Sequence, residues 1–256
     1  MSSSIWTPAA LSSDARRLAG TCWRLVEAQH RVSTLKLVDS VDEQETLEGL
    51  IQATKPALPP ECQHLHYLLS TPFRYGAIYP MGSWFRRAGL TEGVFYAAEA
   101  PETAVAEMAF YRLLFYAESP NTPWPANAAE YTAFSAEYAT RKAIDLSKGR
   151  YTRDRALWMH PTDYEACQDF ADTARSAGIE VIPYASVRDP RQGMNVALLT
   201  GRAFAKPKPS SQQTWHIRLN DAGAHAVCES PRSRVTYDPQ IFAADPRIAK
   251  LRWRRS

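Results

Sequence analysis

Short runs of apolar residues recur along the chain in patterns typical of β-strands. Strands are expected at 22–28 (CWRLVEA) and 93–98 (GVFYAA), where aromatic and β-branched residues concentrate. Further strands are expected within YTAFSAEYATRKAIDLS (131–147), IEVIPYASVRDP (179–190), MNVALLTG (194–201), TWHIRL (214–219) and HAVCE (225–229). The spread of these segments over most of the chain predicts a substantial sheet.

Helices are expected between the strands. The segment 42–56 has acidic residues near its start and ends at a proline. The segment 161–178 also starts with acidic residues, and a glycine stands just beyond its last turn. A third helix follows the strand at 93–98, because Pro101 suits a first helical turn and the apolar pattern continues to about Phe115.

The mixture of these elements predicts a single α+β domain with largely antiparallel sheets flanked by helices. Residues 1–20 are rich in Ser and Ala and are expected to form a loose arm or a short helix. Residues 57–76 are a proline-punctuated connection. The domain is expected to occupy 21–256, with a β-rich extension over about 205–256 whose role the sequence leaves open.

Charge and cysteine content narrow the class of protein. A formal net charge of +3 is too small to indicate a nucleic-acid partner, and the basic ending KLRWRRS is expected to be a solvated tail. The four cysteines lie far apart and form no CxxC pair, so reduced thiols of a cytoplasmic protein are expected. No secretory signal and no run of about 20 apolar residues is evident, so no membrane association is expected.

A glutamate stands within the most apolar of the expected helices. At about 100° per residue, Ala104, Met108, Tyr111 and Phe115 share one helix face. Glu107 lies at the edge of that stripe. A carboxylate in such a place is costly to bury unless a cation pairs with it or hydrogen-bond donors bind it.

Two interpretations of Glu107 stay open from the residues alone. It forms a structural ion pair with an arginine, or it faces a cleft walled by the preceding strand and the helix start. Tyr96 lies eleven positions earlier and, in a strand–turn–helix unit, reaches the same cavity unless it is an ordinary core residue. The opposite helix face is apolar as well, so the helix is expected to be covered on all sides; that face holds Val105, Ala109 and Leu113.

Several common enzyme classes find no support in the sequence. It contains no G-x-G-x-x-G, no Walker A sequence and no G-x-S-x-G elbow. His64 and His66 have no nearby acidic or cysteine partner, so no metal site is expected.

Four blocks, in their order along the chain, resemble the RES-domain toxin family, which is named for characteristic Arg, Glu and Ser positions. They are CWRLVEAQHRVSTLKLVDS (22–40), GSWFRR (82–87), GVFYAAEAPETAVAEMAFYRLLF (93–115) and YASVRDPRQGMNVAL (184–198). The third is the most specific, because it combines a strand, a tyrosine, a Thr-Ala helix start and a glutamate. The resemblance covers about 22–204 and implies an ADP-ribosyltransferase-like fold.

The resemblance also assigns site residues. Arg24 matches the family's early strand arginine and is expected to bind the diphosphate of NAD⁺. Tyr96 and Glu107 match its tyrosine and glutamate, and Ser186 matches its serine. Glu107 is expected to stabilise the sugar cation, with Tyr96 and Ser186 near the same ribose and Asn195 among the nucleotide contacts. Without the family, Ser186 is an ordinary turn hydroxyl and Arg24 a surface cation.

One motif departs from the family pattern. The second family arginine follows the glycines of a GGRW or GSRF motif, but here Trp84 stands where that arginine is expected. Arg86, two positions on, is expected to take its place in catalysis. Arg31 and Arg74 are further candidates for phosphate contacts.

The resemblance implies a toxin that consumes NAD⁺ as substrate, by hydrolysis or phosphorolysis, and that is paired with an Xre-type antitoxin. Two alternatives stay open: transfer of ADP-ribose to a protein target, and a catalytically weakened member that chiefly binds its antitoxin. A homodimer is also left open.

Overall fold

Helices and strands are interspersed along the chain. The computed structural model describes residues 6–28, 37–74, 82–89 and 92–254. The α-helices in this part of the chain are α1 (Pro8–Asp14), α2 (Val41–Thr54), α3 (Tyr67–Arg74), α4 (Pro101–Glu118), α5 (Arg155–Trp158), α6 (Glu165–Ser176) and α7 (Pro246–Ala249). The strands are β1 (Arg16–Glu27), β2 (Phe95–Ala98), β3 (Ala129–Ala143), β4 (Val181–Ala185), β5 (Met194–Leu198), β6 (Ser211–Asn220), β7 (Gly223–Cys228) and β8 (Ser233–Tyr237).

The strands form one mixed sheet in the order β1-β2-β5-β4-β3-β6-β7-β8. The long strands β1 and β3 also pair with each other. The five strands in the order β1-β2-β5-β4-β3 therefore form a closed ring of strand pairings. Among the described strands, β3 and β4 make the one parallel pair, through Ala143 and Val181. The predicted single α+β domain with a largely antiparallel sheet is therefore confirmed.

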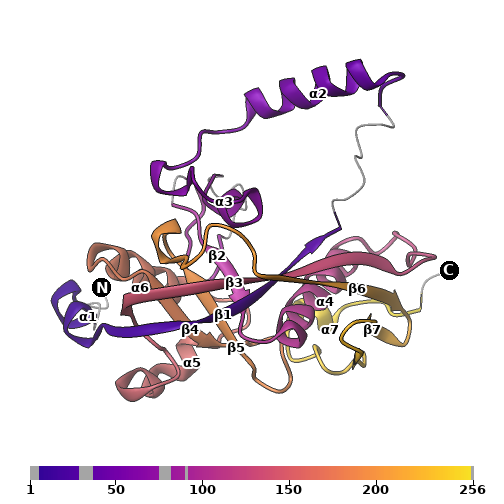
Figure 1. Cartoon of the computed structure of the whole chain (residues 1–256). Coiled ribbons are helices and arrows are strands. Elements are labelled where there is room, and N and C mark those ends of the chain that lie inside the picture. The colour runs from indigo at the N-terminus through magenta and orange to yellow at the C-terminus, as the bar shows by residue number, and fades with distance from the viewer. Residues whose placement is uncertain (1–5, 29–36, 75–81, 90–91, 255–256) are drawn as a thin grey trace.

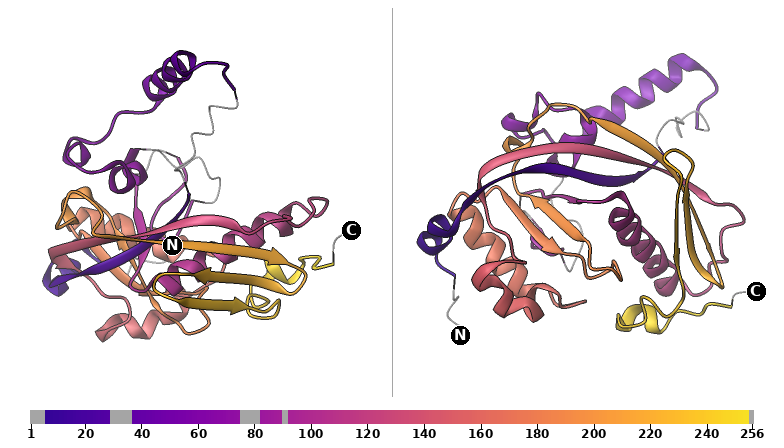
Figure 2. Two further views of the ribbon diagram at one scale, coloured as in Figure 1. Left: turned by 45° about the vertical axis from the view of Figure 1, so that its right-hand side comes forward. Right: turned by 60° about the horizontal axis from the view of Figure 1, so that its bottom comes forward.

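The helices pack on the curved sheet in two groups. In Figure 2 the long strands β1 and β3 arch over α4, and α5 and α6 lie beside β4 and β5. The core around α4 is formed by Val105, Ala109, Phe110 and Leu113 together with Trp215 of β6. The helix α2 stands away from the body, as Figure 1 shows.

The predicted strands and the three predicted helices are present, with shifted ends. β1 begins at Arg16, well before the expected Cys22, and directly follows the short helix α1. The helix α3 was not expected, because Pro72 lies inside it. Two residues of this helix, Leu69 and Phe73, are buried against the sheet. The strand β8 was also missed.

One expectation about α4 is wrong. The side opposite the stripe is core, since Val105 and Leu113 are fully buried, but the stripe is covered only in its first part, at Ala104 and Met108. Tyr111 and Phe115 are 46% and 49% exposed. The apolar stripe therefore faces outward near Glu107, and an apolar side chain alone did not indicate burial.

The residues after 205 have a definite place. β6 pairs with β3, and β7 and β8 extend the same sheet edge. The chain then turns back to place α7 against α4, and the indole of Trp124 donates to the carbonyl of Trp253 at 2.8 Å. The C-terminal segment thus covers one side of the helix that carries Glu107.

The four cysteines are free and buried. Across the described ranges, no helix is both long and apolar enough to cross a bilayer.

Candidate active site

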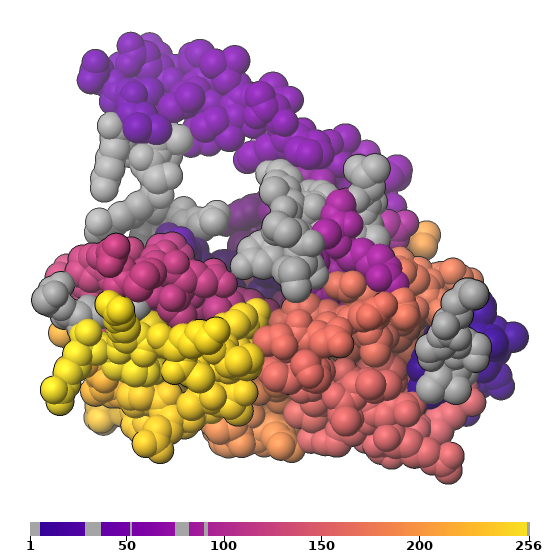
Figure 3. All heavy atoms as spheres, turned by 180° about the vertical axis from the view of Figure 1, so that it is seen from behind, coloured from indigo at the N-terminus to yellow at the C-terminus, as the bar shows by residue number. Residues whose placement is uncertain are grey.

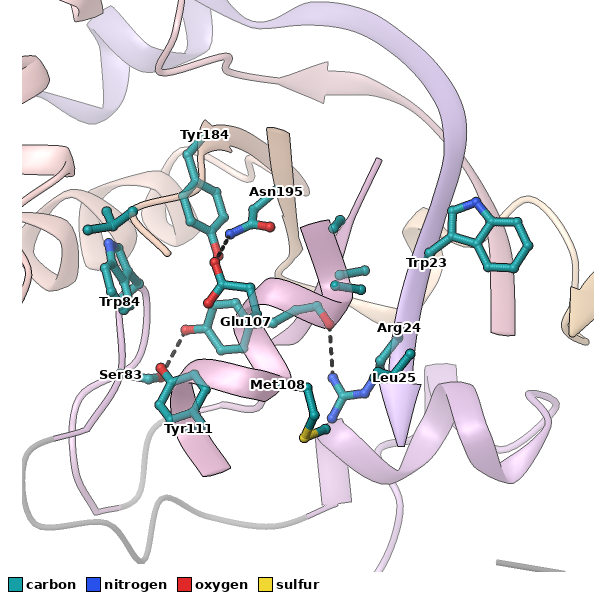
Figure 4. Close-up of a pocket in the computed structure, with 15 residues that line it drawn as sticks. Trp23, Arg24, Leu25, Ser83, Trp84, Glu107, Met108, Tyr111, Tyr184 and Asn195 are labelled. Atoms are coloured by element: carbon teal, nitrogen blue, oxygen red, sulfur yellow. Dashed lines mark hydrogen bonds between the residues drawn. The ribbon is translucent and has the colours of Figure 1, made fainter. Parts of the chain in front are cut away.

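A cavity of about 400 Å³ opens between β1, β2, β5 and α4. This volume is in the range of pockets that hold small molecules and cofactors. The wall is mostly apolar, and its polar members are Arg24, Ser83, Tyr96, Glu107, Tyr111, Tyr184 and Asn195. Figure 4 shows that the labelled polar side chains come from strands, from α4 and, for Ser83, from a turn outside the named strands.

Strand pairing builds one wall of the cavity. Asn195 of β5 lies opposite Ala98 on one side and Tyr184 on the other, and Ala98 lies opposite Trp23. Directly opposed residues in paired strands project to the same face of a sheet. All four of these residues accordingly line the cavity: Trp23, Ala98, Asn195 and Tyr184.

Glu107 projects from the second turn of α4 to meet this row. Its Oε1 accepts a hydrogen bond from Asn195 Nδ2 at 2.6 Å and another from Ser186 Oγ at 2.7 Å. Burial raises the pKa of Glu107, while the two hydrogen bonds and the nearby Arg188 act to lower it. Both hydrogen bonds from described residues fall on Oε1, so Oε2 is the oxygen left for a ligand.

Asn195 has an unsatisfied acceptor. A carboxylate only accepts hydrogen bonds, so the amide group of Asn195 must turn its Nδ2 toward Glu107. Its Oδ1 is then buried without a hydrogen-bond partner among the described residues. A buried carbonyl oxygen of this kind is costly unless something donates to it. Asn195 is thus suited to accept from a ligand hydroxyl or amide.

Ser186 is fully buried and does not line the cavity. Its hydroxyl gives its proton to Glu107 and accepts from the backbone N–H groups of Arg188 (3.1 Å) and Asp189 (2.9 Å). Its hydrogen-bonding capacity is filled by the protein. The position of Ser186 therefore favours holding Glu107 in place over direct contact with a substrate.

We expect Ser186→Ala to destabilise the fold by about 1–3 kcal/mol, because two buried backbone donors and one carboxylate lose their partner. Loss of a donor to the ionised carboxylate also raises the pKa of Glu107 further. Thermal unfolding measures the first effect. The control is Ser176→Ala, whose exposed hydroxyl bonds only the carbonyl of Asp172 within its own helix. Equal melting temperatures for the two variants would contradict this role of Ser186.

Tyr96 lies in the cavity wall and anchors a tight turn. Its Oη accepts from the backbone N–H of Phe85 at 2.9 Å and shares a hydrogen bond of 2.9 Å with Ser83 Oγ. Burial raises the pKa of Tyr96 to about 12, so the hydroxyl stays protonated at neutral pH. The structure brings Tyr96 and Glu107 to the same cavity, as the strand–turn–helix unit suggested.

Arg24 is a cation in the cavity wall without a carboxylate partner in the described part of the chain. Its guanidinium donates to the carbonyl oxygen of Tyr96 at 3.1 Å and lies 5.1 Å from the ring centre of Phe95. Burial lowers the pKa of Arg24 to about 10, which still leaves it charged at neutral pH. A desolvated guanidinium of this kind is matched to an anionic ligand.

Two of the other predicted arginines, Arg86 and Arg74, are not among the residues that line the cavity. Arg86 is at the end of the turn that Tyr96 anchors, and it is not among the lining residues. Arg74 ends α3 and does not line the cavity either. Arg31 lies outside the described residues. The proposed roles of these three residues stay predictions.

Trp84, the departure from the family motif, is part of the protein interior. It is 6% exposed, and its Nε1 donates to the carbonyl of Trp158 at 3.1 Å. Its ring packs on Tyr164, with centroids 4.4 Å apart, while the guanidinium of Arg188 lies 5.3 Å from its centre. The indole thus fills the wall where the family pattern has a cation.

Sequence reasoning missed Tyr184 and Arg188 as neighbours of Glu107, whereas the helical stripe already placed Tyr111 beside it. Tyr184 lies two positions before Ser186, and this spacing places alternate strand residues on one face. Tyr111 follows Glu107 by four positions, which places the two side by side on a helix. Arg188 has no such local signal, because its contacts come from segments far along the chain.

Comparison with known families decides the relationship. The RES domain model matches residues 58–220, which is more than half of the chain. The chain belongs to the RES domain family. The matched range includes Tyr96, Glu107, Ser186 and Asn195, and it leaves out Arg24. A search of curated proteins found no match.

Among residues 6–28, 37–74, 82–89 and 92–254, no cluster of three or more His, Cys, Asp or Glu side chains is arranged to hold a metal ion.

Proposed function

We propose that this RES domain protein cleaves the bond between nicotinamide and ribose in NAD⁺, as a toxin that depletes the dinucleotide. The observation that carries the proposal is Glu107, a carboxylate held by two donors at a cavity whose wall also contains Arg24, a cation with no carboxylate partner among the described residues. An anion and a cation in one mostly apolar cavity suit a ligand that carries a positive ring and a negative diphosphate.

The geometry suggests how the bond would break. The electron pair of the C1′–N bond leaves with nicotinamide, which departs as a neutral molecule and leaves positive charge on the ribose. A carboxylate next to that carbon stabilises the developing cation more than the ground state. An oxygen of water or phosphate then bonds to C1′, and with water as acceptor Glu107 takes the released proton.

The remaining lining residues have supporting roles in this proposal. Arg24 binds the diphosphate, since guanidinium forks match phosphate oxygens. The free Oδ1 of Asn195 accepts from a ribose hydroxyl or from the carboxamide of nicotinamide. The rings of Tyr111 and Tyr184 offer flat apolar surfaces to the nicotinamide. Ser186 holds the carboxylate of Glu107 in place, and Tyr96 holds the turn that carries Ser83 in the cavity wall.

Nicotinamide release tests the proposal. Purified protein is incubated with NAD⁺, once in phosphate buffer and once in a phosphate-free buffer, and nicotinamide is quantified by chromatography. We expect release in at least one buffer, with ADP-ribose as the product of hydrolysis or ADP-ribose 1″-phosphate as the product of phosphorolysis. Absence of nicotinamide in both buffers would contradict the proposal.

The same assay separates the alternative of protein modification. Labelled NAD⁺ with a cell lysate would give a labelled protein band if ADP-ribose is transferred to a target. Free ADP-ribose without a labelled band favours depletion of NAD⁺. A band that persists in Glu107→Gln would refute the role assigned to Glu107 in either reaction.

The antitoxin partner stays a prediction from the family resemblance. We expect expression of the chain alone to arrest bacterial growth, and Glu107→Ala to relieve the arrest. Harmless expression of the unaltered chain would favour a member that chiefly binds its partner.

A further inference from the structure

A buried ion pair joins the C-terminal segment to the loop that carries Ser186. Arg188 Nη1 donates to Asp245 Oδ2 at 2.9 Å, and the two side chains are 3% and 2% exposed. Asp245 stands directly before α7, beyond the matched range 58–220. Figure 3 shows the C-terminal segment, in yellow, against the part of the chain that contains α5 and α6.

Asp245 holds two arginines at once. Its Oδ1 accepts from the backbone N–H and the Nε of Arg247, at 2.9 and 3.0 Å. Its Oδ2 accepts from Arg247 Nη2 at 2.8 Å in addition to Arg188. Both guanidiniums also donate to the carbonyl of Pro161, at 2.6 Å from Arg188 and 3.1 Å from Arg247. Without the carboxylate, the buried cation of Arg188 and the partly exposed cation of Arg247 would repel each other.

Arg188 in turn contacts both Ser186, which donates to Glu107, and α4, the helix that carries Glu107. Its backbone N–H donates to Ser186 Oγ at 3.1 Å, and Ser186 donates to Glu107. Its guanidinium lies 3.8 Å from the ring centre of Phe110, which follows Glu107 by about one turn of α4. A short chain of contacts therefore runs from Asp245 through Arg188 to Glu107.

We propose that Asp245 is a positioning residue of the active site: it holds the guanidinium of Arg188 against α4 and thereby fixes Ser186 and Glu107 for the reaction. The catalytic part of this inference rests on the proposed cleavage of NAD⁺. The C-terminal segment is then part of the functional unit, although it lies outside the matched family region.

The charges around Glu107 set the sign of the expected effect. Arg188 is the cation that lowers the pKa of Glu107, and Asp189 acts in the opposite direction. The neutral groups that face it are Ser186, Asn195, Tyr111, Tyr184 and Tyr237. If Asp245 no longer anchors Arg188, the guanidinium moves away from Glu107 and the pKa of Glu107 rises. Removing the negative charge of Asp245 would by itself lower that pKa, so a rise reports the displacement of Arg188.

Direct titration of Glu107 tests the inference without any NAD⁺. The protein is labelled with glutamate that carries ¹³C in the side-chain carboxyl group, and carboxyl signals are followed against pH by NMR. The signal that disappears in Glu107→Gln belongs to Glu107. We expect Asp245→Asn to move its titration midpoint upward. The conservative Asp245→Glu should return the midpoint most of the way.

The matched control is Asp238→Asn, an exposed carboxylate in the same segment, which should leave the midpoint unchanged. If Asp245→Asn does not fold, Asp245→Ser replaces it, and the same upward shift is expected. Arg188→Gln gives the reference for complete loss of the cation, because it removes the guanidinium itself. An unchanged midpoint, or a shift to lower pH, would overturn the inference even if the melting temperature falls.

The titration of Glu107 and the nicotinamide assay test the two proposals independently. An upward shift together with absent nicotinamide release keeps Asp245 as a positioning residue and rejects the proposed reaction. If the reaction occurs, the acidic limb of the kcat profile should move with the midpoint, whereas a merely structural role would lower stability and leave that limb in place.

Discussion

Glu107→Gln should reduce the rate of nicotinamide release by at least about 10²–10³-fold while leaving the protein folded. The substitution keeps the shape of the side chain, and the amide oxygen of glutamine still accepts from Ser186 and Asn195. What it removes is the negative charge that would meet the sugar cation. The loss should appear mainly in kcat, because that charge acts in the transition state more than in substrate binding.

The stability of this variant should move in the opposite direction from its activity. Burial raises the pKa of Glu107 in the folded state, so folding favours the protonated carboxyl. Below its ordinary pKa the carboxyl is neutral in both states; as pH rises through the ordinary value toward the raised one, the folded state loses stability. At neutral pH, Glu107→Gln removes this cost, and the melting temperature should be equal to or higher than that of the unaltered protein.

The control for Glu107→Gln is Glu118→Gln, an exposed glutamate at the end of the same helix. It should leave both the rate and the melting temperature close to those of the unaltered protein. A Glu107→Gln variant that retains full activity would remove Glu107 from the reaction. A variant that loses activity only because its melting temperature collapses would show a purely structural role of Glu107 instead.

Arg24→Met should weaken binding of ADP-ribose, and raise KM for NAD⁺, by about 10- to 100-fold, the usual effect of losing a hydrogen bond to a charged group. The guanidinium is buried and has no carboxylate partner among the described residues, so its charge is available to the diphosphate. The change in kcat should be smaller, because the diphosphate is remote from the bond that breaks.

Calorimetric titration with ADP-ribose measures the affinity directly. Arg17→Met, an exposed arginine on the same strand, is the matched control and should bind ADP-ribose like the unaltered protein. The melting temperature of Arg24→Met should change little, since removing a buried charge offsets the loss of its hydrogen bond to Tyr96. Unchanged affinity in Arg24→Met would show that the anion binds elsewhere.

Local patterns predicted much of the fold. Aromatic and β-branched runs indicated the strands, and Pro101 marked the start of α4. The limits came where tertiary packing outweighs local preference: α3 forms despite Pro72, and β1 starts at Arg16 because it pairs with the far end of β3. The outward face of Tyr111 also depends on which side of α4 the sheet covers, and no helical period can tell this.

The candidate site divides in the same way. The spacing of Tyr96 and Glu107 predicted a shared cavity, and the structure brings both to one wall. The hydrogen bond from Asn195 to Glu107 joins residues 88 positions apart and was not predicted, since Asn195 was expected only among the nucleotide contacts. No sequence motif indicated the ion pair of Arg188 and Asp245, which are 57 positions apart, and only the structure shows it.

The most direct measurement is a crystal structure of Glu107→Gln with NAD⁺ bound, since this variant should bind the dinucleotide without cleaving it. We predict that the C1′ carbon of the nicotinamide ribose lies beside residue 107, with the diphosphate against Arg24 and a ligand donor on Asn195 Oδ1. NAD⁺ bound at another surface, with this cavity holding only water, would contradict the account.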